Sequence, residues 1–193
     1  SSDQLRVTAG GQEVLAQIKT LGNWQDGSVK WVLVTVLADV PAGGEQQYVL
    51  EYGRDVRRTL TGPPLARAQE QGVVIDTGAL RVAVNEHGDL VLPDGSACAT
   101  TLTAEGGQQF STALGPAQIT IEENGPNRAV IHTVGKLTAA DGTGHFTVEQ
   151  RIEAYRGCSF VRVQHTFVND LAPEFTNIEA MSWQVPIAAG DWA

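Results

Sequence analysis

Helix-forming segments and long apolar runs are almost absent from this sequence. Only Pro64–Gln71 has the composition of a helical turn, and the rest of the chain consists of short apolar segments separated by glycine-containing turns. The longest nearly apolar run, Trp31–Ala38, is far shorter than the ~20 residues that a membrane-spanning helix needs. We therefore expect an all-β protein for which a membrane is not a partner.

Charged residues are also scarce, at 18% of the chain, and most of them are acidic, which gives a net charge of -9. An acidic surface repels nucleic-acid phosphates and anionic lipids, so neither nucleic acid nor a membrane surface is an expected partner. The 13 lysines and arginines are scattered along the sequence and indicate no basic groove for a polyuronate. With 42% hydrophobic residues and 21 glycines, the composition is that of a globular protein with many tight turns.

Spacings typical of metal or nucleophilic sites are absent as well. No His-x-His, His-Glu-x-x-His or Cys-x-x-Cys pattern occurs, so we expect neither a metal nor another cofactor. There is no Gly-x-Ser-x-Gly elbow and no glycine loop leading into a helix. The two cysteines, Cys98 and Cys158, are compatible with a disulfide and with two free thiols, and their spacing does not decide between them.

The most informative segment that is present is Trp24-Gln-Asp-Gly-Ser-Val-Lys-Trp31, in which an Asp-Gly turn precedes a strand over Val29–Leu37. This strand is apolar at almost every position, which is typical of a strand covered on both faces. We therefore expect Trp31 to lie in the core. Trp24 lies just before the turn. An exposed indole can stack its flat face on a sugar ring. Trp24 and Asp26 are the candidate carbohydrate-binding residues, although packing of Trp24 over the turn is the favoured interpretation.

The chain divides into two expected domains. Leu5–Thr8 and Glu13–Thr20 flank a glycine pair and form a predicted hairpin, and Val29–Leu37 with Gln46–Tyr52 forms another. These strands make a small barrel-like domain over residues 1–58. The composition then changes, so we expect residues 59–72 to be a linker and residues 73–193 to form a second domain.

The second domain is predicted to be an antiparallel β-sandwich. Long strands joined by short turns are expected at Gln118–Glu122, Arg128–Thr138, His145–Tyr155 and Ser159–Val168, which is typical of a meander. Alternation places the apolar side chains of these strands on one face, facing a second sheet. The other face carries the charged side chains Lys136, Glu149, Arg151, Glu153 and Arg162.

The four histidines are the first residues to consider for catalysis. His132 lies on the polar face within cross-strand reach of Arg151, which favours a surface pair. His165 alternates in phase with apolar neighbours and points into the core face, where a buried structural histidine is favoured over a catalytic one. His132, Arg151 and His165 form the candidate polar cluster. His87 and His145 lie at turns and are expected to be solvated.

Several motifs resemble one known family, the exo-rhamnogalacturonan lyase-like (PcRGLX/YetA-like) proteins. Trp24-Gln-Asp-Gly-Ser-Val-Lys-Trp-Val-Leu-Val34, with Ala38-Asp-Val-Pro-Ala-Gly-Gly44 and Tyr48-Val-Leu-Glu-Tyr-Gly53, is similar to the N-terminal domain of that family. The second domain resembles the family's central domain at Ile75-Asp-Thr-Gly-Ala-Leu-Arg-Val82 and at Tyr155-Arg-Gly-Cys-Ser-Phe-Val-Arg162 with Phe167-Val-Asn-Asp170.

The resemblance implies a RIFT-type β-barrel, a central β-sandwich and a catalytic α/α-toroid domain that this chain does not contain. No catalytic residue of the family can therefore be assigned to a position here. The chain is expected to be a trimmed or processed part of an extracellular or cell-surface protein. On this view Trp183 and Trp192, near the C-terminal end, need another part of the protein to cover them.

Three functional hypotheses follow. The first is the non-catalytic N-terminal β region of a lyase-like protein acting on rhamnogalacturonan-type pectin, with the remainder of the parent polypeptide as its partner. The second is an autonomous carbohydrate-binding or interaction module that binds a polysaccharide or oligosaccharide through an exposed aromatic platform. The third is a sandwich-fold epimerase or mutarotase-like enzyme, which needs His132 or His165 in an open concave sheet beside a carboxylate.

Overall fold

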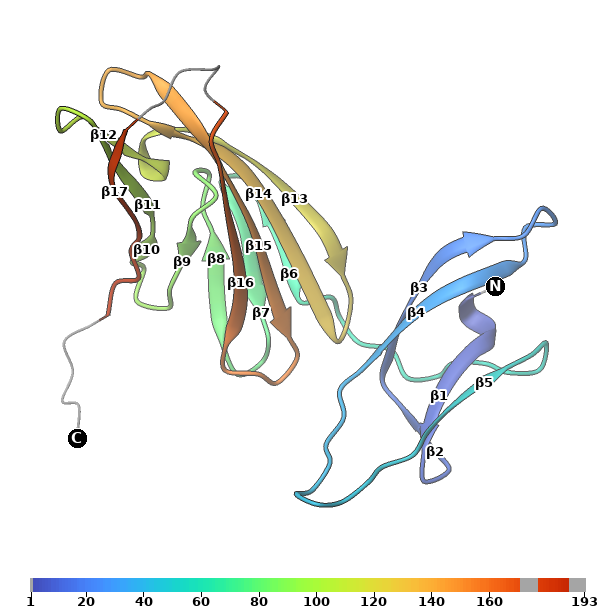
Figure 1. The fold of residues 1–193 in the computed structure, drawn as a ribbon. Helices are drawn as coiled ribbons and strands as arrows, with labels where there is room; N and C mark the ends of the chain where they lie inside the picture. The colour runs from blue at the N-terminus through green and yellow to red at the C-terminus, as the bar shows by residue number, and fades with distance from the viewer. Residues whose placement is uncertain (1, 171–176, 188–193) are drawn as a thin grey trace.

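Antiparallel strands make up nearly all of the regular structure in the computed structural model, which describes residues 2–170 and 177–187 (Figure 1). The N-terminal elements are the 3-10 helix η1 (Ser2–Gln4) and strands β1 (Leu5–Ala9), β2 (Gln12–Val14), β3 (Ala16–Asn23), β4 (Val29–Val36) and β5 (Tyr48–Tyr52). The predicted all-β fold, a small barrel-like unit followed by an antiparallel sandwich, is confirmed.

The sandwich consists of a small sheet and a large sheet. The small sheet has the order β10-β9-β8-β7-β6, and the large sheet has the order β16-β15-β14-β12-β11-β17, with β13 paired to β14. The strands of the small sheet are β6 (Ala66–Gln69), β7 (Gly72–Asp76), β8 (Arg81–Val84), β9 (Leu90–Val91) and β10 (Ala97–Cys98). The remaining elements are β11 (Thr100–Ala104), β12 (Gln109–Ser111), the 3-10 helix η2 (Thr112–Leu114), β13 (Ala117–Asn124), β14 (Arg128–Thr138), β15 (Gly144–Tyr155), β16 (Val161–Val168) and β17 (Ile178–Trp183).

The meander predicted from the sequence corresponds to β13, β14, β15 and β16. Successive strands pair antiparallel, and the predicted bounds of β14 agree with the structure. Alternate residues of β15 are buried from Phe146 to Ala154, as the expected core face requires. Ile75 of the small sheet and Ile131 and Ile152 of the large sheet have no exposed surface and pack in one cluster between the sheets. Burying each such side chain stabilises the fold by roughly 1.5–3 kcal/mol.

Two details around the small sheet differ from the sequence-based expectations. Residues 66–69, inside both the expected helical turn and the expected linker, form β6 and pair with β7. The helical turn is therefore wrong, because the segment pairs with β7 as an edge strand and buries Ala66 in the core. Trp183 packs against the sandwich core of this chain and needs no other cover, whereas Trp192 lies outside the described residues. Both Cys98 and Cys158 are free thiols.

The N-terminal unit contains two separate sheets. The β1–β2 hairpin is confirmed, and β5 adds to the other edge of β1. The expected hairpin between Val29–Leu37 and Gln46–Tyr52 is wrong, because β4 pairs with β3 and forms a two-stranded ribbon. A two-stranded ribbon has no neighbouring sheet to cover both of its faces, which decides the environment of Trp31 discussed below.

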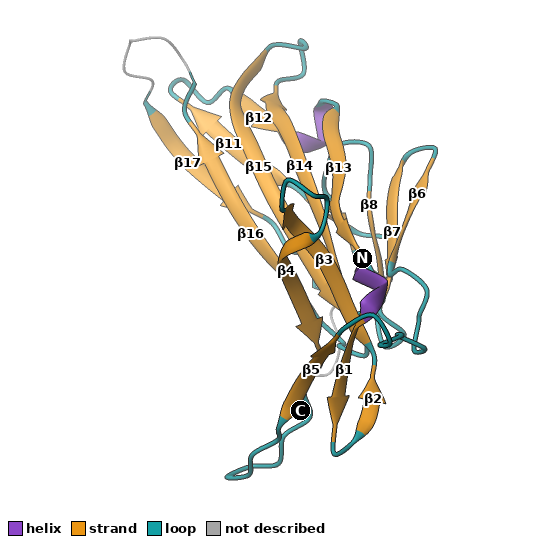
Figure 2. Ribbon diagram, turned by 90° about the vertical axis from the view of Figure 1, so that its right-hand side faces the viewer, coloured by secondary structure: helices purple, strands orange, loops and turns teal. Residues whose placement is uncertain are grey.

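Gln17 and Asn127 join the N-terminal unit to the sandwich. In Figures 1 and 2 the N-terminal unit approaches the sandwich near the loop between β13 and β14, and Figure 1 shows the rest of the β3–β4 ribbon apart from the large sheet. Asn127 is 1% exposed and donates its side-chain amide to the carbonyls of Leu15 (2.8 Å) and Thr35 (3.0 Å). Gln17 donates to Glu123 and accepts from the backbone N–H of Asn127 (3.0 Å). No helix within residues 2–170 and 177–187 is long and apolar enough to cross a membrane.

Gly125 makes this close approach possible. A Cβ atom at Gly125 would lie 2.2 Å from Cδ of Gln17, so any side chain there displaces the glutamine. The junction therefore depends on a buried amide, a glutamine and the space left by a glycine.

We predict that Asn127→Ala lowers the free energy of unfolding by about 2 kcal/mol, because it removes two hydrogen bonds from a buried amide to the carbonyls of Leu15 and Thr35. Urea denaturation followed by tryptophan fluorescence measures this loss. Asn23→Ala, at an exposed position of β3, is the control and should change stability by less than about 0.5 kcal/mol. Equal stabilities of the two variants would contradict the importance of the junction.

Candidate functional site

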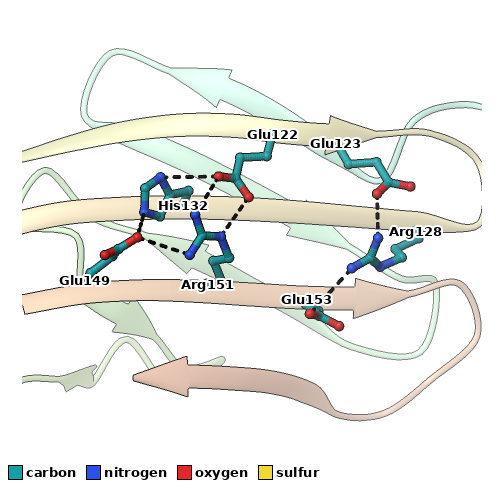
Figure 3. Close-up of polar contacts among 7 residues, drawn as sticks. All are labelled: Glu122, Glu123, Arg128, His132, Glu149, Arg151 and Glu153. Carbon is teal, nitrogen blue, oxygen red and sulfur yellow. Dashed lines mark hydrogen bonds and ion pairs between the residues drawn. The ribbon is translucent and has the colours of Figure 1, made fainter. Parts of the chain in front are cut away.

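The candidate site is a cluster of charged side chains on the outer face of the large sheet. Glu122 comes from β13, His132 from β14, and Glu149 and Arg151 from β15 (Figure 3). His132 lies directly opposite Arg151 in the β14–β15 ladder, so the predicted cross-strand proximity is confirmed. Glu149 is two residues from Arg151 on the same face, because side chains alternate along a strand.

The four side chains form a closed set of contacts. Arg151 makes two hydrogen bonds of 3.0 Å with the carboxylate of Glu122 and one of 3.1 Å with Glu149. Nε2 of His132 lies 2.6 Å from Glu149, and its Nδ1 lies 3.4 Å from Glu122. Both ring nitrogens of the histidine therefore face a carboxylate, and each carboxylate also contacts the guanidinium.

The electrostatics of this cluster favour the ionised forms of Glu122 and Arg151. The hydrogen bond from Arg151 lowers the pKa of Glu122, and the charges of Arg151, His132 and Lys19 lower it further. The same hydrogen bond raises the pKa of Arg151. The side chains of Glu122 and Arg151 are about a third exposed, so water screens their attraction and each pair stabilises the fold only weakly. Lys19, whose charge adds to this effect, belongs to β3 of the N-terminal unit.

A second set of ion pairs continues toward the junction. Arg128 contacts Glu123 at 2.5 Å and Glu153 at 3.4 Å, as Figure 3 shows. The side chains of the two glutamates are only 9% and 12% exposed, so this pair is better shielded from water than the His132 cluster. Glu123 also accepts from Gln17, which connects the charged face to the N-terminal unit. The outer face is thus a continuous strip of paired charges.

His165, the third member of the predicted polar cluster, lies on the opposite face of the sheet. It is paired in register with Gln150, which is 2% exposed, and not with Arg151. Nε2 of His165 lies 2.8 Å from the hydroxyl of Thr100, and burial lowers the pKa of the imidazole. The structural role favoured for His165 agrees with this position, whereas the proposed grouping with His132 and Arg151 does not hold.

A buried polar chain extends from His165 into the sandwich. The backbone N–H of Thr100 donates to the hydroxyl of Thr112 (3.0 Å), which donates to Asp89 (2.6 Å). Asp89 has no exposed surface, its second carboxylate oxygen lacks a partner among the described residues, and burial raises its pKa. Sequence reasoning missed Asp89 because it lies in a polar turn segment, where an exposed carboxylate is the ordinary expectation.

The candidate carbohydrate-binding residues Trp24 and Asp26 do come together, at the tip of the β3–β4 ribbon. Both line an open depression of about 820 Å³ with Lys30, whose ammonium lies 4.3 Å from the centre of the Trp24 ring. Trp24 is 56% exposed. Asp26 accepts from the backbone and hydroxyl of Ser28, and the hydroxyl contributes most to lowering its pKa.

Trp31 is 64% exposed, so the prediction that it lies in the core is wrong. The run Val29–Val36 is apolar, yet β4 has only β3 as a neighbour, and its second face is left uncovered. The β3–β4 register passes from Gly22–Trp31 directly to Asn23–Val29, so the ladder is irregular at Lys30. Trp31 does not line the depression formed around Trp24, Asp26 and Lys30.

His87 and His145 are half-buried and not fully solvated. Nδ1 of His87 lies 2.8 Å from the carbonyl of Gly115, and the His145 ring packs 5.5 Å from the Phe110 ring. No group of three or more His, Cys, Asp or Glu side chains in the described part of the chain is arranged to hold a metal ion. The cluster around His132 has one imidazole between two carboxylates that already share an arginine, which suits a structural ion network.

The fold and the site together define the class of protein. It is an antiparallel two-sheet β-sandwich, preceded by a small β unit, with ion pairs along the outer face of its large sheet. The family model of the PcRGLX-like protein central beta sandwich domain matches residues 65–191, well over half of the chain. The chain therefore belongs to the PcRGLX-like family. The match begins one residue before β6, where the small sheet starts.

Solved structures share the fold at low identity. An alpha-mannosidase from Enterococcus faecalis V583 superposes with a TM-score of 0.60 at 14% identity over 88% of this chain. A protein in the glycosyl hydrolase family 38 from Enterococcus faecalis gives a TM-score of 0.58 at 12% identity over 89% of this chain. The chain spans 25% and 26% of the lengths of these two proteins. No curated protein sequence matches this chain.

We predict that the arginines of the outer face differ in their importance for stability. Arg128→Ala should lower the free energy of unfolding by about 2 kcal/mol, because Glu123 and Glu153 are largely shielded from water. Arg151→Ala should cost less, and Arg162→Ala least, because the Arg162 side chain is 67% exposed and lies 3.7 Å from Glu153. Urea denaturation of the three variants gives the order, and a larger loss for Arg162 than for Arg128 would contradict it.

We also predict a pH dependence that originates at His165. Because burial lowers the pKa of His165 below 6.5, the unfolded chain binds a proton near and below this pH that the folded chain does not. The contribution of His165 to stability is therefore present above pH 6.5 and is lost as the pH falls through the lowered pKa. The stability difference between the wild type and His165→Gln should shrink from pH 7.5 to pH 5.5 in urea denaturation. A difference independent of pH would contradict this assignment.

Proposed function

We propose that this chain is the non-catalytic N-terminal β region of a polysaccharide lyase-like protein acting on rhamnogalacturonan-type pectin. Its role is to support a separate catalytic α/α-toroid domain and to line one wall of the substrate cleft. The parent protein is proposed to be extracellular or at the cell surface. The remainder of the parent polypeptide is the principal partner, with residues 1–58 as the first domain and the sandwich as the second.

Membership of the PcRGLX-like family carries this proposal, because the match covers the whole sandwich from β6 onward. The fold shared with parts of two much longer proteins, whose names describe a mannosidase and a glycosyl hydrolase family member, gives further support to a place within a large carbohydrate-active protein. The closed contacts around His132 also favour a structural role for the outer face. An acid–base pair for sugar chemistry needs a carboxylate or imidazole with a proton site open to substrate.

The uncovered apolar residues of the N-terminal unit fit a supporting role. Trp31 and Leu33 of β4 are 64% and 40% exposed, and Tyr52 of β5 is 79% exposed. Large apolar side chains left exposed are often covered by another protein or domain. We assign this surface to contact with the remainder of the parent polypeptide.

The experiment compares the 193-residue chain with the parent protein in a β-elimination assay on rhamnogalacturonan. Ultraviolet absorbance of the unsaturated uronate product measures the activity. We expect product from the parent protein and none from the 193-residue chain. Lyase activity in the 193-residue chain alone would refute the non-catalytic role, and inactivity of the parent protein on pectic substrates would refute the assigned chemistry.

The depression at the ribbon tip favours sugar binding as a second candidate function. Trp24 supplies an exposed ring, and Asp26 and Lys30 supply polar groups beside it. Calorimetry with a rhamnogalacturonan oligosaccharide tests this function. Trp24→Ala should abolish the binding heat, whereas Trp31→Ala, at an exposed indole that does not line the depression, should retain it. Equal loss in both variants, or no heat with the wild type, would exclude a sugar site at the tip.

A further inference from the structure

A cavity of about 240 Å³ on the small sheet gathers positive charge in an otherwise acidic chain. Three arginines and one aspartate line it, together with apolar and glycine residues: Arg67, Arg81, Arg156, Asp76, Pro63, Pro64, Leu65, Val74 and Gly78. The whole chain has only 13 lysines and arginines and a net charge of -9. The arginines are distant in sequence, so the scattered distribution of basic residues hides this cluster.

The β-ladder explains how the cluster forms. Arg67 of β6 is opposite Val74 of β7, and Arg81 of β8 is opposite Asp76 of β7. Ile75, between the two β7 residues, has no exposed surface and points into the core. Alternation therefore sends the side chains of Arg67, Val74, Asp76 and Arg81 to the same outer face of the small sheet.

Two of these arginines have no ionic partner among the described residues. Arg128 and Arg151 of the large sheet each contact two carboxylates, whereas Arg67 and Arg81 are exposed and form no ion pair within the described part of the chain. Asp76 accepts the backbone N–H of Gly78 (2.9 Å) instead of pairing with Arg81.

Arg156 holds a third positive charge at the cavity wall. Its guanidinium donates to the carbonyls of Pro126 and Pro63, the latter at 2.8 Å, so backbone groups fix the side chain, and no carboxylate of the described residues pairs with it. Pro64 and Leu65 form an apolar wall beside it. A second cavity of about 250 Å³, with mostly apolar walls, continues from this one and shares Val74 and Arg81.

We propose that the outer face of the small sheet between Arg67 and Arg81 binds a compact ligand carrying an oxyanion group. Arg67 and Arg81 contact the oxyanion, Arg156 adds long-range attraction, and the apolar wall packs against the body of the ligand. A carboxylate on a sugar ring and an inorganic oxyanion share this chemistry. The inference does not depend on the lyase-like function proposed above, but a uronate ligand would deepen it.

The chemistry of the cavity supports this assignment. Guanidinium groups bind planar oxyanions with two parallel hydrogen bonds, and free arginines retain all their donors for this purpose. Proline and aliphatic surfaces suit the C–H face of a pyranose ring, whose hydroxyl groups can stay in water. Because the site is open, binding should weaken as ionic strength rises.

The test is an NMR titration of the isotope-labelled 193-residue chain with D-galacturonate, inorganic phosphate and, as a neutral control, D-galactose. We expect galacturonate to shift the backbone amide signals of residues 66–68, 73–76 and 81–83, and galactose to leave them unchanged. Arg67→Ala and Arg81→Ala should each weaken binding roughly fivefold or more. Arg162→Ala removes an exposed arginine from the other sheet and should leave the affinity unchanged.

Each outcome bears on the proposal. Stronger binding of galacturonate than of phosphate identifies an acidic-sugar site, and the reverse identifies a site for inorganic oxyanions. Equal shifts with galactose and galacturonate, shifts at other residues only, or unchanged affinity in both arginine variants would overturn the proposal. Amide spectra of the variants establish that they remain folded. Binding here together with an inactive parent protein would leave this inference standing while refuting the lyase-like function.

Discussion

Side-chain alternation along the paired strands β14 and β15 is the constraint on which the rest of the molecule depends. One face of this pair buries Ile131 and Ile152 against the small sheet, and the opposite face carries His132 and Arg151 side by side. A shift of one residue in register would bring the charges into the core, so the apolar cluster also determines where the ion pairs lie. The same rule on the small sheet sends Arg67 and Arg81 outward while Ile75 stays inside.

The two outer faces of the sandwich differ in how their charges are used. On the large sheet the cations are matched by carboxylates, so this face is electrostatically satisfied and continues through Glu123 and Gln17 into the N-terminal unit. On the small sheet the arginines are left without ionic partners in the described residues. A face whose charged side chains are paired with one another suits a structural role. Unpaired guanidinium groups beside a cavity suit recognition of an anion. This contrast separates the part that supports the architecture from the part that we propose binds a ligand.

Prediction from sequence succeeded where local pattern and tertiary packing agree. The strand at 144–155 alternates strictly and the strand at 128–138 is long and bounded by turn residues, so the meander, its core face and the pairing of His132 with Arg151 were predictable. It failed at β4, where an apolar run indicates burial only if a neighbouring sheet exists. It also failed at 66–69, where a short polar segment becomes a strand because β7 offers it an edge.

The sequence by itself determined the all-β class, the family and the face of each long strand, because period-two alternation and motifs are local properties of the chain. Only the tertiary structure decided which side chains from distant segments meet: His132 with Glu149 and Glu122, Asp89 with Thr112, and Arg67 with Arg81 and Arg156. The physical reason is that strand order and burial are set by long-range pairing. Pairing of this kind leaves no signal in the spacing of the residues that it brings together.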